Sequence, residues 1–317
     1  MKLKKPLIIG GILSVAGVAL MCATFNESNF NISWEKGKGL ETVSVRKNQQ
    51  NFAKNDIKNV DLNVKNQQVT LKQGDTDSWQ VKTTSWGGKQ SSVNVKDGTL
   101  HVTAKDNTQD NMVMMFGDSD TGFSFNNYDE ESDTTIVVPR DVKISQINVT
   151  GKDGGVIMDD FKADQIKVQM QDGGARIRNI QSKSLNMNSS DGRMYVENST
   201  FDKMQVTGRD MGVSGSGLKL NQASSINLRD GHVAIDKVQV PGYNLHAKSE
   251  ITFESGAKDK DGNYIKIDKD DENNTVKRGN QQQALTINAN YSTIALSEHA
   301  GLPDDSDDDD SDDASDY

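Results

Sequence analysis

The chain has 317 residues, of which 33% are hydrophobic and only 6% aromatic, with 27 glycines against 4 prolines. This balance argues against a compact globule with a thick core and favours a thin, regular stripe of small and branched aliphatic side chains. Nine aspartates between Asp304 and Asp316 supply nearly all of the net charge of −10, so the near-neutral remainder argues against nucleic acid as a partner.

Residues 1–27 have the layout of a membrane anchor. Three lysines precede a charge-free stretch from Pro6 to Asn26, and Glu27 follows it. About 20 residues at 1.5 Å each span a hydrocarbon core of roughly 30 Å. The lysines before the stretch place the rest of the chain outside the cell. We therefore expect one uncleaved transmembrane helix, a juxtamembrane linker over 28–41 and an extracellular domain in a single-pass membrane protein.

Two other interpretations of the amino terminus stay open. A basic head followed by an apolar middle is also the layout of a cleaved signal peptide. The lone Cys22 allows lipidation, although Met21 before it is larger than the usual residue at such a site. A single cysteine in any case excludes an intramolecular disulfide and a cysteine-based metal site.

Residues 42 to 145 predict a loose β region. Apolar residues alternate with polar ones around Val60, Val69, Val81 and Leu100, and Asp97-Gly98 predicts a turn. An insertion that begins at Asn111 gathers apolar side chains without such alternation. We interpret it as a cap over the first coil, with a partner-binding surface as the alternative. The apolar residues concerned are Met114, Met115, Phe116, Phe123 and Phe125.

Residues 146–240 are an array of repeats. Four segments align without gaps at a spacing of 19 residues, and a fifth follows after 20. On both sides of a recurrent aspartate, apolar residues alternate with period two, which predicts short strands with one buried face. Stacked copies bury a face that one strand pair cannot. We therefore predict an all-β, single-stranded β-solenoid. The recurrent aspartates are Asp153, Asp172, Asp191, Asp210 and Asp230.

These aspartates predict a ladder of structural turns. In most copies glycine follows the aspartate, and glycine tolerates the positive φ of a tight bend. The alternative is a carboxylate ladder that binds Ca²⁺, but calcium-binding solenoids carry denser glycine and carboxylate patterns. No histidine, phosphate-loop or nucleophile motif appears. We expect no cofactor, no metal and no enzymatic activity.

One charged patch is a candidate catalytic site. Asp159 and Asp160 fall near Arg176, Arg178 and Arg193 in the 19-residue frame. Carbohydrate-active enzymes cluster carboxylates in this way. The interpretation that we prefer is a solvated face whose ion pairs cross between coils.

The carboxyl-terminal part has three segments. A polar stretch from Ser255 predicts a mobile loop, and "ALTINANYSTIAL" from Ala284 predicts closing strands. Residues 298–317 predict a disordered acidic tail, because the segment is too charged to fold. The folded domain is therefore expected over 42–297.

The segments "IKNVDLNVKNQQVTLKQGD" at Ile57, "VKDGTLHVTAKD" at Val95, "TTIVVPRDVKISQINVTGKDGGV" at Thr134 and "LTINANYSTIAL" at Leu285 carry a family resemblance. The chain resembles the candidate adhesins known as domain of unknown function 4097. The resemblance covers residues 42 to 297 and implies a solenoid-like surface domain, often membrane-anchored in Gram-positive bacteria. It supplies no catalytic residues.

We therefore expect a non-enzymatic, adhesin-like module in the bacterial cell envelope. Its expected partners are the membrane, through the amino-terminal helix, and a cell-wall polymer, a host glycan or an envelope protein. Some members of the family look linked to envelope stress, so a regulatory component that acts through a membrane partner is the second hypothesis. A carbohydrate-active enzyme is the third.

Overall fold

The computed structural model describes residues 30–35, 39–86, 91–104, 113–115, 124–125, 134–258, 260, 264–266 and 275–299. These residues form an all-β structure of strands β1 to β22 with one short 3-10 helix, η1 (Gln281–Gln283). Among them, no helix is long and apolar enough to cross a membrane. The anchor expected over 1–27 and the tail after residue 299 lie outside the described residues.

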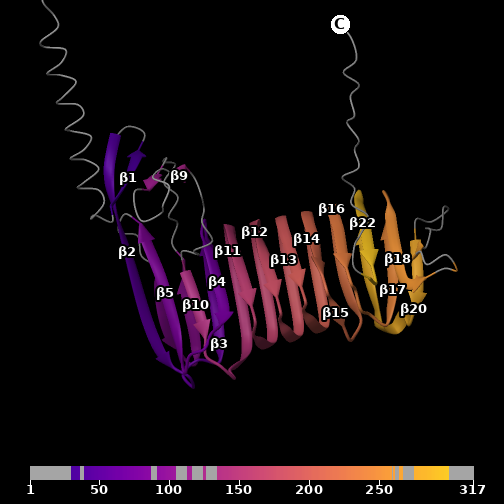
Figure 1. Cartoon of the computed structure of the whole chain (residues 1–317), viewed down its shortest axis with the longest axis horizontal. Helices are drawn as coiled ribbons and strands as arrows, with labels where there is room; N and C mark the ends of the chain where they lie inside the picture. Colours follow the sequence, from indigo (N-terminus) through magenta and orange to yellow (C-terminus); the bar gives the residue numbers. More distant parts are fainter. Residues whose placement is uncertain are drawn as a thin grey trace, which may run out of the picture.

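The centre of the molecule is a parallel β-solenoid (Figure 1). Ile147 pairs with Ile166, and the same offset of 19 relates each of the next two coils. Val206 pairs with Ile226, an offset of 20. The sequence repeat is thus the stacking register, which confirms the predicted solenoid. Its strands are β11 (Lys143–Asp159), β12 (Lys162–Arg178), β13 (Gln181–Glu197), β14 (Thr200–Ser216), β15 (Lys219–Leu220) and β16 (Ser224–Asp236).

The interior is one stripe of aliphatic side chains. Alternate residues of each strand point inwards, and stacking places them in rows that exclude water. Burial of one such side chain stabilises the fold by about 1.5–3 kcal/mol. Within residues 146–240 the residues predicted to face inwards are all buried, among them Ile147, Val149, Ile166, Val168, Leu185, Met187, Met204, Val206, Val156, Met158, Ile177, Val196, Val213 and Ile235.

The predicted aspartate corner bends in two ways. Asp153 and Asp172 themselves adopt the left-handed conformation, each with φ of 53°. In two later coils the following glycine has the positive φ instead, 122° at Gly192 and 131° at Gly231. Aspartate and glycine are residues that tolerate this region. The bend therefore belongs to the Asp-Gly pair rather than to glycine alone.

A second left-handed corner connects each coil to the next. Its backbone amide donates to a carbonyl of the following coil, as Asn179 does to Glu197 at 3.0 Å. A buried residue then fills the corner. In two coils this residue is Phe161 or Ile180, and in the next coil it is Ser199, whose hydroxyl accepts a hydrogen bond from the Ile180 amide. The apolar residue recurs in the sequence eight positions after the corner aspartate, as Phe161, Ile180, Leu218 and Val238, and a left-handed residue precedes each of them. The left-handed residues are Asp141, Asp160, Asn179, Asn198, Gly217 and Lys237.

At the amino-terminal end, stacking order differs from sequence order. Val60 of β3 and Val69 of β4 pair with β11, so these two strands form the coil next to the repeats. The next coil combines β7, on β3, with β10, on β4. Antiparallel strands β6, β5 and β2 cover that end. The bounds are β2 (Gly39–Ala53), β3 (Asn59–Lys65), β4 (Gln68–Gln73), β5 (Ser78–Trp86), β6 (Ser92–Lys96), β7 (Thr99–Thr103) and β10 (Thr134–Val138).

A small antiparallel sheet joins the described parts of the apolar insertion to residues 30–35. The strand β1 (Phe30–Glu35) pairs with β2 on one side and with β8 (Val113–Met115) on the other. β8 also pairs with β9 (Ser124–Phe125). The segment interpreted as a linker, 28–41, therefore contains β1 and the start of β2.

The carboxyl-terminal end repeats this reversal. β21 and β22 come last in the sequence, yet they pair directly with β16. β17 and β18 stack on their outer side, followed by antiparallel β20 and β19. The final strands are thus inserted into the stack (Figure 1). The bounds are β17 (Gly242–Ala247), β18 (Ile251–Lys258), β19 (Tyr264–Lys266), β20 (Thr275–Gly279), β21 (Ala284–Ala289) and β22 (Ser292–Ser297).

Candidate binding face

The five predicted aspartates stack along one edge of the solenoid. Asp191 pairs in register with Asp210, and Asp210 with Asp230. The pKa of Asp172 is raised, first by a hydrogen bond with Asp191 and then by desolvation and the charge of that neighbour. Arg209 contacts Asp210 at 3.2 Å, which offsets part of this repulsion. Among the described residues, no group of three or more histidine, cysteine or acidic side chains is placed to hold a metal ion.

The candidate catalytic patch is occupied by contacts between coils. Arg178 donates two hydrogen bonds to Asp159, at 2.8 and 2.7 Å, and this pair raises the pKa of the arginine. Asn179 donates to Asp160 at 2.7 Å. The guanidinium of Arg176 lies 5.4 Å from the ring centroid of Tyr195. The structure therefore joins Asp159 to Arg178 as a cross-coil pair, the arrangement that we preferred over a catalytic site.

The apolar insertion is described only in part. Met114 and Met115 lie in β8, and Phe125 lies in β9. Phe116 and Phe123 lie outside the described residues. The backbone pairing of β8 with β1 connects this insertion to the strand nearest the expected anchor.

Opposite charges alternate across coils at two places. At the first, Lys72, Asp159, Arg178 and Glu197 are successive partners in the ladder. At the second, Asp164 lies between Lys143, at 2.6 Å, and Lys183, at 2.8 Å. A slip of one residue would set Asp159 opposite an uncharged residue, Ile177 or Asn179, and would lose these attractions, so the rows help to fix the register. These rows are visible in the sequence, because opposite charges recur at a spacing of 19 residues, as in Asp159 and Arg178 or Asp164 and Lys183.

We predict that Asp164→Asn lowers and Asp172→Asn raises the stability of the fold at neutral pH, and that both differences fade on acidification. Hydrogen bonds from Lys143 and then Lys183 lower the pKa of Asp164. Its contribution to stability is therefore present above the ordinary carboxyl pKa, about 3.9, and is lost as pH falls through the lower folded value. Asp172 has a raised pKa, so its charge destabilises the fold at neutral pH, and protonation on acidification removes that effect.

Urea unfolding between pH 7 and pH 2.5 measures both effects. Relative to the wild type, Asp164→Asn should lower the midpoint at pH 7, and the difference should shrink below pH 4. Asp172→Asn should raise the midpoint at pH 7, with the gain also fading as pH falls, because asparagine keeps the left-handed corner. Equal responses of the two variants would contradict this assignment.

One broad face of the solenoid carries uncharged polar side chains. The outward positions before the aspartate corner hold amides and hydroxyls in register from coil to coil. These side chains are exposed or half-buried. Asn288 donates to Asn227 at 2.8 Å, a bond between adjacent coils. We name this row the amide row; its residues are Asn63, Thr150, Gln169, Asn188, Thr207, Asn227 and Asn288.

A parallel row lies two residues earlier in each strand and is mostly uncharged. Its seven positions include two charged side chains, Asp61 and Lys167. We name the two rows together the amide face. The alternation in the sequence defines the outward positions of each repeat, but the face itself was not predicted. The second row is Asp61, Asn148, Lys167, Asn186, Gln205, Ser225 and Thr286.

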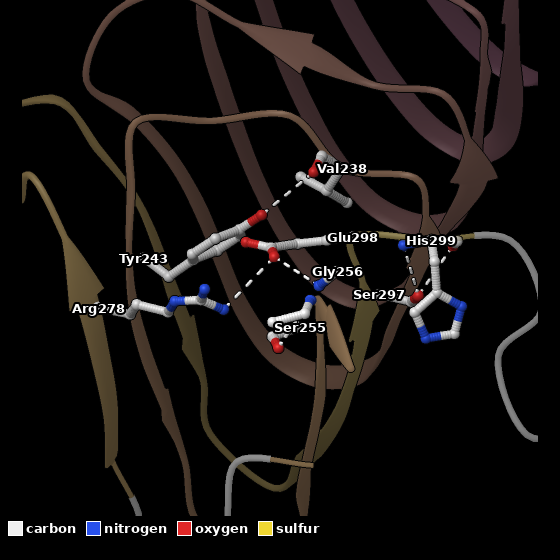
Figure 2. A network of polar contacts seen from close by, with 9 residues as sticks. Val238, Tyr243, Ser255, Gly256, Arg278, Ser297, Glu298 and His299 are labelled. Atoms are coloured by element: carbon white, nitrogen blue, oxygen red, sulfur yellow. Dashed lines mark hydrogen bonds and ion pairs between the residues drawn. The ribbon is translucent and has the colours of Figure 1, made fainter. Parts of the chain in front are cut away.

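A polar network ties down the last coil (Figure 2). The carboxylate of Glu298 accepts from the Gly256 amide at 2.7 Å and from Arg278 at 3.4 Å. The hydroxyl of Tyr243 donates to the Val238 carbonyl at 3.2 Å, and burial is the main cause of its raised pKa. His299 lies 2.9 Å from Glu254 with both side chains nearly buried. The network joins β17, β18, β20 and the end of β22.

The chain is similar to known proteins at two levels, solved structures and a family model. The chain is similar to three solved structures of candidate adhesins, each with 97% of its own length covered: from Bacteroides fragilis (14% identity, 79% of this chain, TM-score 0.38), Parabacteroides merdae (10%, 83%, 0.39) and Parabacteroides distasonis (11%, 79%, 0.40). No curated protein matches the chain. A family model described as Toastrack DUF4097 matches residues 57–300, which is most of the chain and confirms the resemblance carried by the repeats. The chain belongs to the Toastrack DUF4097 family.

Proposed function

We propose that this chain is a non-enzymatic, adhesin-like interaction module at the bacterial cell surface. The amide face carries the proposal. It presents a wide array of hydrogen-bonding groups on strands whose positions are fixed by the stack. Rigid strands hold such groups in place before a partner arrives, which lowers the entropy that binding must overcome.

The distribution of charge on β12 and β13 supports this role. Arg178 and Glu197 belong to the alternating ladder, Lys183 pairs with Asp164, and Lys167 is the one charged side chain that these two strands place on the amide face. The amide row on the same strands holds only Gln169 and Asn188. Solvated surfaces ordinarily carry mixed charges. An uncharged row beside charged ones therefore marks a face with a separate role.

The amino terminus supports a place at the membrane. The basic head and apolar stretch of residues 1–27 favour a single span with the solenoid outside. Full-length protein in its own cells should stay in membranes washed with alkaline carbonate, and protease added to intact cells should digest the solenoid. Release by carbonate, or protection from protease, would contradict this placement.

Binding is tested with full-length protein and isolated cell-envelope fragments in a sedimentation assay. Asn188 and Gln181 are both exposed on β13, but only Asn188 lies on the amide face. Asn188→Arg should weaken binding at least tenfold, whereas Gln181→Arg should bind as the wild type does. Equal binding by both variants would contradict the proposal. A deletion strain would also contradict the proposal if the expression of envelope-stress genes changed while adhesion and envelope binding stayed normal. That result is expected of a stress-signalling component.

A further inference from the structure

We propose that the amide face binds a neutral polysaccharide and that Tyr291 is its aromatic stacking residue. This inference rests on the proposed surface function and names the class of partner. The partner lies along the axis of the solenoid, across successive coils, with a sugar ring against the tyrosine.

The chemistry of the amide row selects an uncharged, hydroxyl-rich partner. Amides and hydroxyls both donate and accept hydrogen bonds, as sugar hydroxyls do. A polyanion or polycation would find no complementary charge along the row, because no residue in it is ionised at neutral pH. An apolar partner would leave these groups without hydrogen bonds, which costs free energy.

The geometry of the row suits a polymer. Successive coils lie about 4.8 Å apart in a β-solenoid, so equivalent groups recur at a constant interval along the axis. Thr150, Gln169 and Asn188 follow one another in this way, and Asn227 and Asn288 continue the row to the carboxyl-terminal coils. A repeating chain laid along the stack meets a similar group at each coil.

Tyr291 stands at the corner that aspartate occupies in the repeats. Leu228 pairs with Ala289 and Gly231 pairs with Ser292, both at an offset of 61, and the same offset places Tyr291 at the position of Asp230. It is three residues beyond Asn288, the last member of the amide row. The aromatic ring therefore lies where the amide face meets the corner.

The conformation of Tyr291 is unfavourable for its type. Its φ is 56°, a region that bulky residues rarely adopt. The residue is 67% exposed, so burial returns little of this cost. The ammonium of Lys248 lies over the ring, 4.6 Å from its centroid, in a favourable cation–π contact. A strained and exposed aromatic residue beside a polar face is a site at which strain indicates function.

The substitution Tyr291→Gly separates binding from folding, because glycine relieves the positive φ while it removes the ring. Full-length protein in detergent is run on native gels that contain galactomannan, xyloglucan or dextran as neutral probes, and polygalacturonate as an anionic one. At least one neutral polysaccharide should retard the wild type. Tyr291→Gly should weaken that retardation at least tenfold and raise the thermal unfolding midpoint, while Tyr291→Phe should bind as the wild type does.

Three results would overturn the inference: no retardation by any neutral probe, retardation by polygalacturonate alone, or unchanged retardation of Tyr291→Gly. The envelope assay with Asn188→Arg distinguishes this failure from that of the proposed function. Loss of envelope binding by Asn188→Arg, together with wild-type binding of Tyr291→Gly to the neutral probes, would support the proposed surface function and contradict the role of Tyr291.

Discussion

The variant Ile287→Asp is expected to lose the carboxyl-terminal coils while the central repeats stay folded. Ile287 is fully buried in β21, where it pairs with Ile226 on one side and Leu245 on the other. An unpaired carboxylate at this position has no partner in the aliphatic stripe, and such a burial costs about 4 kcal/mol or more. Each coil contacts only its neighbours, so the damage should spread outwards from β21.

The location of the damage is the informative part. β17 and β18 precede β21 in the sequence but lie outside it in the stack. Hydrogen exchange should therefore show lost protection in residues 242–258, with β12 and β13 still protected. Asn288→Asp is the matched control, because its side chain is exposed on the same strand. Protection of 242–258 in the Ile287→Asp variant would contradict the inserted position of β21 and β22.

The central fold could be predicted from sequence because its information is local. A period of two identifies the buried face, and a period of 19 identifies the stacking partner of each residue. Val149 and Val168 show both rules, since each is buried and each pairs with the other. Within the array, sequence order and stacking order coincide.

The two ends could not be predicted, because their partners are not adjacent in sequence. Val60 pairs with Ile147 across an offset of 87, and Ile226 pairs with Ile287 across 61. No period in the sequence reports these distances. The resemblance places Tyr291 at a turn of the closing strands, but its stacking position above Asp230 depends on the second of these offsets.

The second corner carried a signal that the aspartate repeat obscured. Asp160, Asn179, Asn198 and Gly217 recur every 19 residues, and all are types that tolerate positive φ. Lys237 breaks the pattern, although it adopts the same conformation with φ of 51°. The amide face was available too, since every second residue of a strand with one buried face must point outwards.

The second large effect is expected for Gly192→Met, which should destabilise the fold by about 3 kcal/mol or more. Gly192 has a φ of 122°, and a Cβ there would overlap the backbone of Gly173 in the preceding coil. Backbone atoms of a packed coil cannot move aside as the end of a flexible side chain can. Urea unfolding measures the loss. Gly155→Ala is the control, because its Cβ would lie 3.8 Å from the nearest atom, and it should change stability by about 1 kcal/mol or less.

The next coil shows how methionine fits at this register. Met211 pairs with Gly192, yet it is fully buried, and Gly208 leaves the space it occupies, since a Cβ on Gly208 would lie 2.7 Å from that of Met211. In β13 the position equivalent to Gly208 holds Ser189, which is buried and donates to the Asp191 carbonyl at 2.7 Å.

The double variant Ser189→Gly/Gly192→Met should therefore regain most of the stability that Gly192→Met loses. It gives β13 the glycine and the methionine that β14 has at Gly208 and Met211. Equal instability of the single and double variants would show that the corner of each coil is set by the backbone register alone. Recovery would show that a coil can exchange a glycine corner for a methionine corner when one interior side chain makes room.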